Sequence, residues 1–237
     1  MNAEYGGNNM QKQTITIQSK QCHIYTTEHP KYLLIQPVDE HDLEVLDNEI
    51  AETECRTTAL FMLAAFRVTD WNSELSPWTA PPVFGKQGFG SGAADTLSFI
   101  ETKLIPEIIS QFDIPENIPV VIGGYSLAGL FSLWSAYNSE RFSAVAAASP
   151  SVWFPKGDEY MRSHSLKADC VYLSLGDKEE KTKNKVMATV GERIREQYEL
   201  LKDRNCTLEW NEGNHFKEPD IRTAKAFAWC INKLEAL

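Results

Sequence analysis

The stretch that decides the fold is PVVIGGYSLAGLFSLW, residues 119–134. Its first half is rich in β-branched residues, as in a buried strand, and its second half is an apolar segment typical of a helix. Two glycines, a tyrosine and Ser126 lie between the two halves. A serine at such a junction can simply cap the helix, or it can be held at a sharp bend with its hydroxyl exposed.

The segments on both sides of this junction alternate between strand-like and helix-like patterns. Residues 13–26 alternate apolar and polar side chains, which predicts two short antiparallel strands. Further strands are expected at 31–37, 57–66, 119–124, 144–149, 170–176 and 206–210, and helices at 39–54, 94–112, 127–138, 185–202 and 220–234. This alternation predicts an α/β fold, with a mostly parallel central sheet, helices on both faces and an antiparallel N-terminal edge.

Two long segments interrupt the alternation. Residues 67–93 are irregular and rich in Pro, Gly and Trp, and loops of this length inside a domain are often functional. Residues 150–166 form a second irregular segment. Large aromatic residues here either wall a substrate pocket or anchor the loops to the core. The candidates for the pocket wall in these segments are Trp71, Trp78, Trp153 and Phe154, and Tyr125 at the junction is a further candidate.

Length and charge limit the classes of protein that fit. The 237 residues, 43% of them hydrophobic, can bury one large core without metal or disulfide staples. We therefore expect a disordered tail at residues 1–10 and a single domain over residues 11–237. The net charge of −10, with Lys and Arg scattered, disfavours nucleic acid as a partner.

The cysteines indicate a reducing environment. There are five, dispersed along the chain with no CxxC pair and no histidine spacing typical of a zinc site. The first residues show no signal-peptide pattern, and the longest apolar runs are too short to cross a bilayer. We therefore expect a cytoplasmic protein with no membrane association, no metal and no cofactor. The oligomeric state stays open.

The junction itself matches a nucleophile elbow. That pattern is G-x-S-x-G on a strand–turn–helix, where small residues let the strand and the helix nearly touch. Gly124-Tyr125-Ser126-Leu127-Ala128 gives G-x-S-x-A, and alanine keeps most of the clearance. We therefore expect Ser126 to be a nucleophile rather than a plain helix cap.

A serine nucleophile in such a fold is followed along the chain by an acid and then by a histidine. Downstream of Ser126 the histidines are His164 and His215. His164 lies in a polar loop, whereas His215 follows the last expected strand and precedes the last expected helix. A histidine in that loop can reach a serine two strands away, so His215 is the expected general base.

The acid is expected after the strand at 170–176, where three carboxylates lie within one turn. A carboxylate there would hold the imidazole in the right tautomer. Many hydrolases of this architecture carry the acid three residues after a strand-ending glycine, and three residues after Gly176 is Glu179. Glu179 is therefore the expected acid and Asp177 its nearest alternative; Glu180 and a Ser–His dyad without an acid stay open.

An oxyanion requires two donors aimed at it. One is expected from the backbone N–H of Leu127, directly after the nucleophile. The second is expected from the loop after the third strand. Pro37 has no N–H, so Val38 is the expected donor and Asp39 the alternative.

Together these segments resemble the α/β-hydrolase superfamily, and within it the esterase family that includes esterase D-like and siderophore (enterobactin-type) esterases. The similar segments are GSGAADTLSFIETKLIPEI, GGYSLAGLFSLWSAYN, AAASPSVWF and EGNHFK. The resemblance covers residues 90–230 well and the first ninety residues more loosely. Tyr125 and Ala128 stand where the family usually has His and Gly, and residues 70–90 do not match the siderophore enzymes.

The resemblance implies an α/β-hydrolase fold, with Ser126 as nucleophile, His215 as base and an ester or activated acyl compound as substrate. With the residues above, it predicts a serine carboxylic-ester hydrolase that acts through an acyl-enzyme on a small ester. Two alternatives stay open. One is a hydrolase of thioesters or other acyl bonds, and the other is a catalytically silent member of the fold that binds a small molecule or a protein.

Overall fold

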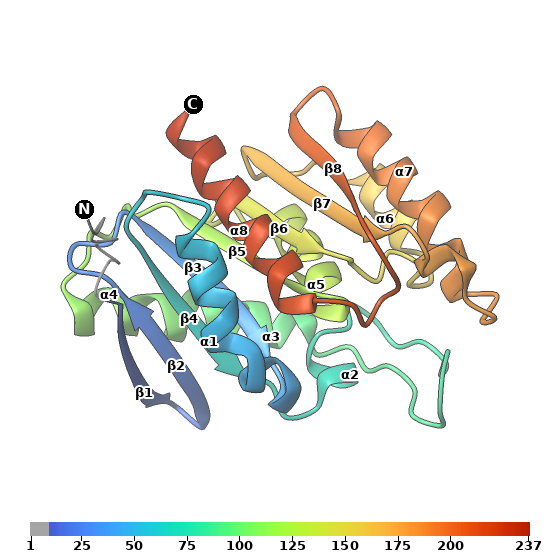
Figure 1. Ribbon diagram of the computed structural model, residues 1–237. Coiled ribbons are helices and arrows are strands. Elements are labelled where there is room, and N and C mark those ends of the chain that lie inside the picture. Colours follow the sequence, from blue (N-terminus) through green and yellow to red (C-terminus); the bar gives the residue numbers. More distant parts are fainter. Residues whose placement is uncertain (1–9) are drawn as a thin grey trace.

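The computed structural model describes residues 10–237 of the chain. Within these residues, eight strands form one sheet in the spatial order β1-β2-β4-β3-β5-β6-β7-β8 (Figure 1). The strands are β1 (Gln11–Ile17), β2 (Lys20–Thr26), β3 (Tyr32–Val38), β4 (Phe61–Arg67), β5 (Val120–Tyr125), β6 (Ala144–Ala148), β7 (Cys170–Gly176) and β8 (Asn205–Asn211). β2 pairs antiparallel with β1 and β4, and the other pairs are parallel. The predicted fold class, with its antiparallel N-terminal edge, is confirmed.

Helices connect the parallel strands. They are α1 (Glu40–Glu54), α2 (Trp71–Glu74), α3 (Ala93–Phe99), α4 (Ile105–Phe112), α5 (Leu127–Asn138), α6 (Gly157–Ser163), α7 (Val190–Leu201) and α8 (Pro219–Glu235). A π-helical turn (Ile100–Leu104) joins α3 to α4, and 3-10 turns cover Glu179–Lys181 and Met187–Thr189. Within residues 10–237, no helix combines the length and the apolar character needed to span a membrane. The predicted disordered tail, apart from Met10, lies outside the described residues.

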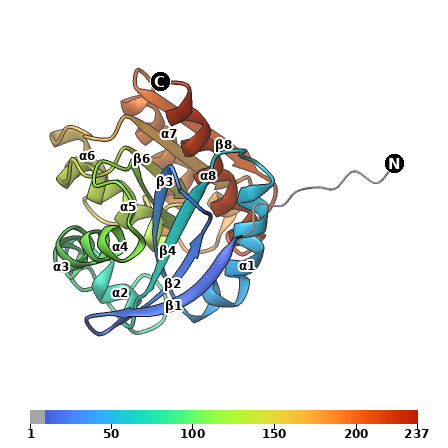
Figure 2. The same cartoon turned by 90° about the vertical axis from the view of Figure 1, so that its left-hand side faces the viewer.

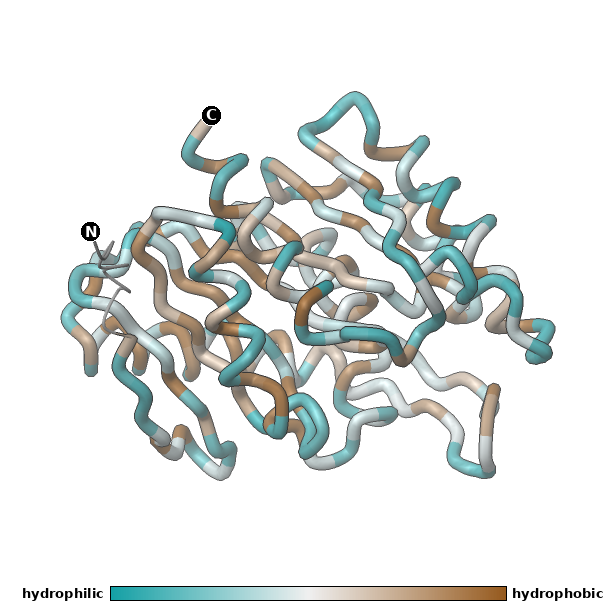
Figure 3. The backbone as a smooth tube through the Cα atoms, in the orientation of Figure 1, coloured by the Kyte–Doolittle hydropathy of each residue, from teal (hydrophilic) through white to brown (hydrophobic). Residues whose placement is uncertain are grey.

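Each face of the sheet has its own core. On one face Leu33 and Ile35 of β3 pack with α3, α4 and α5, and on the other face Leu34 packs with α1 and α8. Figure 2 shows this division, with α3, α4 and α5 on one side of the strands and α1 and α8 on the other. Figure 3 shows hydrophobic residues concentrated along the central strands and hydrophilic ones on loops. Because both faces are covered, strands such as β4 and β6 are continuous apolar runs.

Parallel strands bring the predicted site residues to one edge of the sheet. Ser126 follows β5, Glu179 lies shortly after β7, and His215 lies shortly after β8. These strands run in the same direction, so the loops at their carboxyl ends gather at a common edge. The loop after β4, which contains α2, reaches the same edge (Figure 1).

Four local features differ from the sequence prediction. The helix expected at 185–202 begins only at Val190, after a 3-10 turn. The segments 67–93 and 150–166, expected to be irregular, contain the short helices α2 and α6. These helices have four and seven residues, too few to show an apolar periodicity. The helix expected at 94–112 contains the π turn, because Pro106 has no N–H to donate to the preceding turn.

Candidate active site

Ser126 lies between β5 and α5 in a strained backbone conformation. Its φ of 58° and ψ of −118° fall in a region that residues other than glycine rarely adopt. Its N–H donates to the Ala148 carbonyl at 3.1 Å, and its carbonyl accepts from the N–H groups of Leu130 at 3.1 Å and Ser151 at 3.0 Å. Hydrogen bonds on both sides thus hold the bend, as expected of a nucleophile elbow.

Small residues let β5 and α5 approach each other at the bend. A Cβ atom added to Gly124 would lie 2.7 Å from the Cβ of Ala128. A Cβ added to Gly129 would lie 3.0 Å from the Gly124 carbonyl oxygen and 3.2 Å from that of Ala148. The methyl group of Ala128 fits, so the G-x-S-x-A variant of the motif keeps the bend.

His215 faces the Ser126 hydroxyl. It lies in the loop between β8 and α8, and its Nε2 is 2.9 Å from Ser126 Oγ. The Ser126 side chain makes no capping hydrogen bond to α5, in contrast to the alternative of a plain helix cap. His164, the other downstream histidine, stacks on Tyr160 at the end of α6. The His215 side chain is 22% exposed, so the imidazole is accessible to water.

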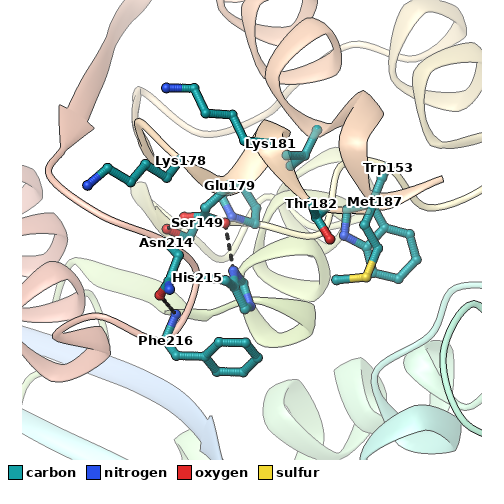
Figure 4. Close-up of a pocket in the computed structure, with 12 residues that line it drawn as sticks. Ser149, Trp153, Lys178, Glu179, Lys181, Thr182, Met187, Asn214, His215 and Phe216 are labelled. Atoms are coloured by element: carbon teal, nitrogen blue, oxygen red, sulfur yellow. Dashed lines mark hydrogen bonds and ion pairs between the residues drawn. The ribbon is translucent and has the colours of Figure 1, made fainter. Parts of the chain in front are cut away.

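Glu179 contacts the other nitrogen of the imidazole. Its Oε2 lies 2.6 Å from His215 Nδ1, the contact drawn as a dashed line in Figure 4. Asp177 is exposed and instead accepts a hydrogen bond from the Gly213 N–H at 2.7 Å. Glu180 forms an ion pair with an arginine of α7. Of the three candidate carboxylates, Glu179 is the one in contact with His215.

The second oxygen of Glu179 is surrounded by donors. Oε1 accepts from the Gly176 N–H at 2.7 Å, the Ser149 hydroxyl at 2.8 Å and the Arg222 guanidinium at 3.1 Å. Burial alone would raise the pKa of Glu179, but the contact with His215 and the bonds from Gly176 and Ser149 together lower this pKa below its ordinary value. The carboxylate therefore stays charged and can accept a hydrogen bond from the Nδ1 side of the His215 ring.

Two cavities meet at His215. One, of about 420 Å³, contains Ser126 and has largely apolar walls. Its aromatic residues are Trp71, Phe84, Phe89, Trp153 and Phe216. The second, of about 440 Å³, lies on the Glu179 side and includes Lys178 and Lys181. Figure 4 shows that both lysine side chains extend away from the imidazole.

The predicted pocket residues divide into two groups. Trp71 and Trp153 line the cavity in front of Ser126. Trp78 does not line it, because its indole N–H donates to the Pro155 carbonyl at 2.8 Å and anchors the loop. Tyr125 does not line it either, because its side chain packs on the sheet face covered by α8. Of the five residues predicted for the pocket, the structure brings Trp71 and Trp153 to this cavity and places Trp78, Phe154 and Tyr125 elsewhere.

Loops from two parts of the chain meet at the mouth of this cavity. The Asn184 side-chain amide, in the segment after β7, donates to the Val83 carbonyl, in the segment after β4, at 2.6 Å. Two phenylalanines of the cavity are exposed, Phe84 to 56% and Phe216 to 85%. The rim is therefore apolar, although the chain carries a net charge of −10.

The two predicted oxyanion donors differ in position. Leu127 is the first residue of α5, where helix N–H groups have no partner inside the helix, and it lines the cavity with Ser126. Val38 ends β3, which runs beside β5, but it is fully buried and is not among the residues lining that cavity. The Asn72 side chain is a further polar group in the cavity wall.

Three polar residues of the site were not predicted from the sequence. Ser151 Oγ lies 3.3 Å from Ser126 Oγ, and Ser149 and Arg222 donate to Glu179. The serines carry no distinguishing signal, since serine is common in loops. Arg222 carried a detectable signal. It precedes Ala226 and Cys230 by four and eight residues, a spacing that places it on the buried face of α8.

Comparison with known proteins identifies the family. A family model described as "Putative esterase" matches residues 62–217, which include Ser126, Glu179 and His215. The chain belongs to this esterase family. The resemblance read from the sequence is thereby confirmed, and the protein is an esterase. No curated protein matches its sequence.

Solved structures similar to the esterase share its fold at low sequence identity. The IroE-like serine hydrolase from Shewanella oneidensis has a TM-score of 0.75 and 16% identity, covering 92% of this chain and 79% of that chain. The siderophore hydrolase EstA from Aspergillus nidulans has a TM-score of 0.70 and 17% identity, and the match covers 96% of this chain and 95% of that chain. The BES protein from Bacillus cereus has a TM-score of 0.64 and 16% identity, and the match covers 94% of each chain. These matches show the same α/β-hydrolase fold.

Proposed function

We propose that this esterase is a serine carboxylic-ester hydrolase, with Ser126 as nucleophile, His215 as general base and Glu179 as the acid that orients the base. The observation that carries the proposal is the continuous contact from hydroxyl to imidazole to carboxylate. The two distances are 2.9 Å between Ser126 Oγ and His215 Nε2 and 2.6 Å between His215 Nδ1 and Glu179 Oε2. Both lie within hydrogen-bond reach, as proton transfer requires.

The acylation step follows from these contacts. Ser126 Oγ attacks the carbonyl carbon of the ester while His215 Nε2 takes the hydroxyl proton. The charge that then develops on the imidazole is stabilised by Glu179, which stays ionised because its pKa is lowered. When the tetrahedral intermediate collapses, His215 gives the proton to the leaving alkoxide, and the alcohol departs. The acyl group stays on Ser126.

Water then removes the acyl group by the same proton path. His215 takes a proton from the attacking water and returns it to Ser126 Oγ when the carboxylic acid leaves. In both steps the carbonyl oxygen carries negative charge. We propose the Leu127 N–H as one donor to this oxyanion; Val38 is buried and does not line the cavity, so its N–H is not proposed as the second.

The cavity in front of Ser126 supports a small ester with an apolar acyl group. Its volume of about 420 Å³ and its five aromatic residues suit an acyl group of aryl or short alkyl size. The similar structures include two siderophore hydrolases from Aspergillus nidulans, so siderophore esters form one class of small ester to test.

Hydrolysis of p-nitrophenyl butyrate tests the proposal. Ser126→Ala should lower kcat by on the order of 10⁶-fold, because removing the nucleophile of a triad costs about that much. Ser132→Ala is the matched control, since Ser132 is a buried serine of the same helix whose hydroxyl donates to the Ala128 carbonyl. It should keep the wild-type kcat. A fluorophosphonate should modify the wild type at Ser126, as mapped by mass spectrometry.

The same assay separates the rival functions. Turnover retained in Ser126→Ala would show that the nucleophile lies elsewhere. A wild type that turns over neither p-nitrophenyl butyrate nor a butyryl thioester would be a silent member of the fold. Faster turnover of the thioester than of the oxygen ester, at matched acyl groups, would assign a thioesterase.

We also propose that the esterase works in a reducing compartment such as the cytoplasm. All five cysteines are free thiols, and three of them are buried. Fractionation of the cells that produce the esterase would test this, because recovery of the activity outside the cytoplasmic fraction would contradict the proposal.

A further inference from the structure

One buried arginine has no part in the mechanism above. Arg222 lies in the first turn of α8, and its side chain is 2% exposed. A buried charge is costly unless it is paired and hydrogen-bonded, so the contacts of Arg222 indicate its role. Figure 1 shows the first turn of α8 at the edge of the sheet where α5 begins.

Arg222 first contacts the acid. Its Nη1 donates to Glu179 Oε1 at 3.1 Å, and the N–H of Gly176 and the hydroxyl of Ser149 donate to the same oxygen. Three donors on Oε1 keep the carboxylate from rotating. Oε2 is left as the oxygen that accepts from His215. Arg222 thus helps to select which oxygen faces the base.

Arg222 also contacts the loop that carries the base. Its Nη2 donates to the carbonyl of Glu212 at 3.0 Å and to that of Asn214 at 3.1 Å. Asn214 directly precedes His215 in the chain. A guanidinium is planar and its N–H groups have fixed directions. One rigid group therefore spans the acid and the backbone that holds the base.

Tyr125 provides a second connection. Its hydroxyl accepts from Arg222 Nη1 at 3.0 Å and donates to the His215 carbonyl at 2.8 Å. Tyr125 is the last residue of β5 and directly precedes Ser126. The nucleophile strand is thereby tied to the base loop through the same arginine.

We propose that Arg222, together with Tyr125, is a positioning residue that holds the acid, the base loop and the nucleophile strand as one unit. The inference rests on the proposed triad and goes beyond it, because a Ser-His-Glu triad does not by itself require an arginine or a tyrosine at these places. Lysine would keep the charge of Arg222. It offers donors from a single nitrogen, however, so it cannot serve Glu179 and the loop carbonyls together.

The experiment compares Arg222→Lys, Tyr125→Phe, the double variant and the control Thr223→Val. Thr223 follows Arg222 on α8 and is equally buried, and its hydroxyl donates to the Pro219 carbonyl within the helix. For each variant we would measure kcat and KM with p-nitrophenyl butyrate, the thermal unfolding midpoint, and the downfield proton NMR signal of His215 Nδ1–H. That signal reports the hydrogen bond to Glu179, and a merely structural contact would not move it.

The expected result is a loss in kcat without a matching change in KM. Arg222→Lys should lower kcat by roughly 10–100-fold, because misplacing a catalytic group by about 1 Å costs on the order of 10²-fold. Tyr125→Phe should lower kcat by less. The double variant should lose less than the product of the two single losses, since both residues act in one network. The Nδ1–H signal should shift or broaden in both variants and stay unchanged in Thr223→Val.

The inference is overturned if folded Arg222→Lys and Tyr125→Phe keep kcat within about twofold of the wild type with an unchanged Nδ1–H signal. It is also overturned if Thr223→Val loses as much activity as Arg222→Lys. If Arg222→Lys does not fold, Tyr125→Phe alone tests the inference, which is overturned if that variant keeps the wild-type kcat and Nδ1–H signal. An inactive Ser126→Ala beside fully active Arg222 and Tyr125 variants would remove this inference alone, whereas an active Ser126→Ala would remove the triad as well.

Discussion

At the scale of single residues, Glu179 differs from the carboxylates around it by its surroundings. Its side chain is 4% exposed and has a hydrogen-bond partner on each oxygen, whereas Asp177 lies in solvent. The same chemical group can therefore orient a base in one place and only shape a loop two residues earlier. Burial with complete hydrogen bonding, rather than charge alone, makes the difference.

Replacing Glu179 by Gln tests this distinction. An amide can present its N–H₂ group to His215 and favour the wrong tautomer, so kcat should fall by about 10⁴-fold, as an acid-to-amide change does in a Ser-His-Asp triad. Asp177→Asn should have a much smaller effect. Initial rates with p-nitrophenyl butyrate measure both. A loss of less than tenfold in Glu179→Gln would instead indicate a Ser–His dyad.

The roles proposed for Ser126, Glu179 and His215 could be predicted from the sequence because chain order and strand ends limit the choice. Downstream of Ser126 there were two histidines, and one of them followed a strand. Arg222 and Tyr125 could not be found in this way. Their places depend on which face of an element a side chain occupies, and on contacts across 43 and 90 residues of sequence.

At the scale of elements, the crossing of β5 and α5 depends on Gly129. A Cβ atom there would meet two carbonyl oxygens and the Cα of Pro150, all of them backbone atoms that cannot easily move. Gly129→Ala should therefore destabilise the fold by about 1–3 kcal/mol, the usual cost of overpacking. Gly157→Ala is the control, because a Cβ at Gly157 in α6 would meet no atom within 4 Å. Urea unfolding measures both free energies, and equal values would contradict the prediction.

Helix α1 contains a buried acid that should make stability depend on pH. Glu49 is 4% exposed; its Oε2 accepts from Gln36 at 3.3 Å, and its Oε1 has no partner among the described residues. Burial raises the pKa of Glu49 well above 4.5, and the charges of Asp42 and Asp220 add to the effect. The folded state therefore holds a proton that the unfolded chain releases above about pH 4.5, so stability is lost as pH rises towards the folded pKa.

Glu49→Gln should remove the part of this dependence that comes from Glu49, whereas Asp42, whose pKa burial raises to about 7, keeps its own. The amide needs no proton to be neutral, so the variant should gain up to about 1.4 kcal/mol over the wild type for each pH unit above 4.5. Glu44→Gln, on the exposed face of the same helix, should show no such gain. The free energies of unfolding of the wild type and both variants at pH 5, 6 and 7 measure this gain. A difference between Glu49→Gln and the wild type that is constant with pH would contradict the prediction.

Elements with a long pattern could be predicted from the sequence, and short ones could not. The helix expected at 127–138 has the same bounds as α5, and the apolar run at 57–66 includes all of β4 except its last residue, Arg67. The helices α2 and α6 lie in segments whose composition is typical of loops. They form because the surrounding structure holds those segments, and a local pattern does not contain that information.

At the scale of the whole molecule, the sheet is continuous from β1 to β8, and the site uses the carboxyl ends of three of its parallel strands. The distance between Ser126 and His215 therefore depends on β5, β6, β7 and β8 keeping their register. We accordingly propose that residues 11–237 unfold as a single unit, as the sequence predicted for one domain.

The cysteines can test this proposal, because they lie near both ends of the sheet. Cys55 is exposed, whereas Cys22 lies in β2 and Cys170, Cys206 and Cys230 lie in β7, β8 and α8. Burial raises the pKa of the Cys22 thiol to about 11 and that of Cys206 to about 12, so these thiols form little of the reactive thiolate at neutral pH.

Native protein should thus show one fast-reacting thiol with a disulfide reagent, and Cys55→Ser should show none. In rising urea the remaining thiols should become reactive together, at the midpoint at which activity is lost. Earlier exposure of Cys22 than of the others would mean that the antiparallel edge unfolds first and that the chain does not behave as one unit.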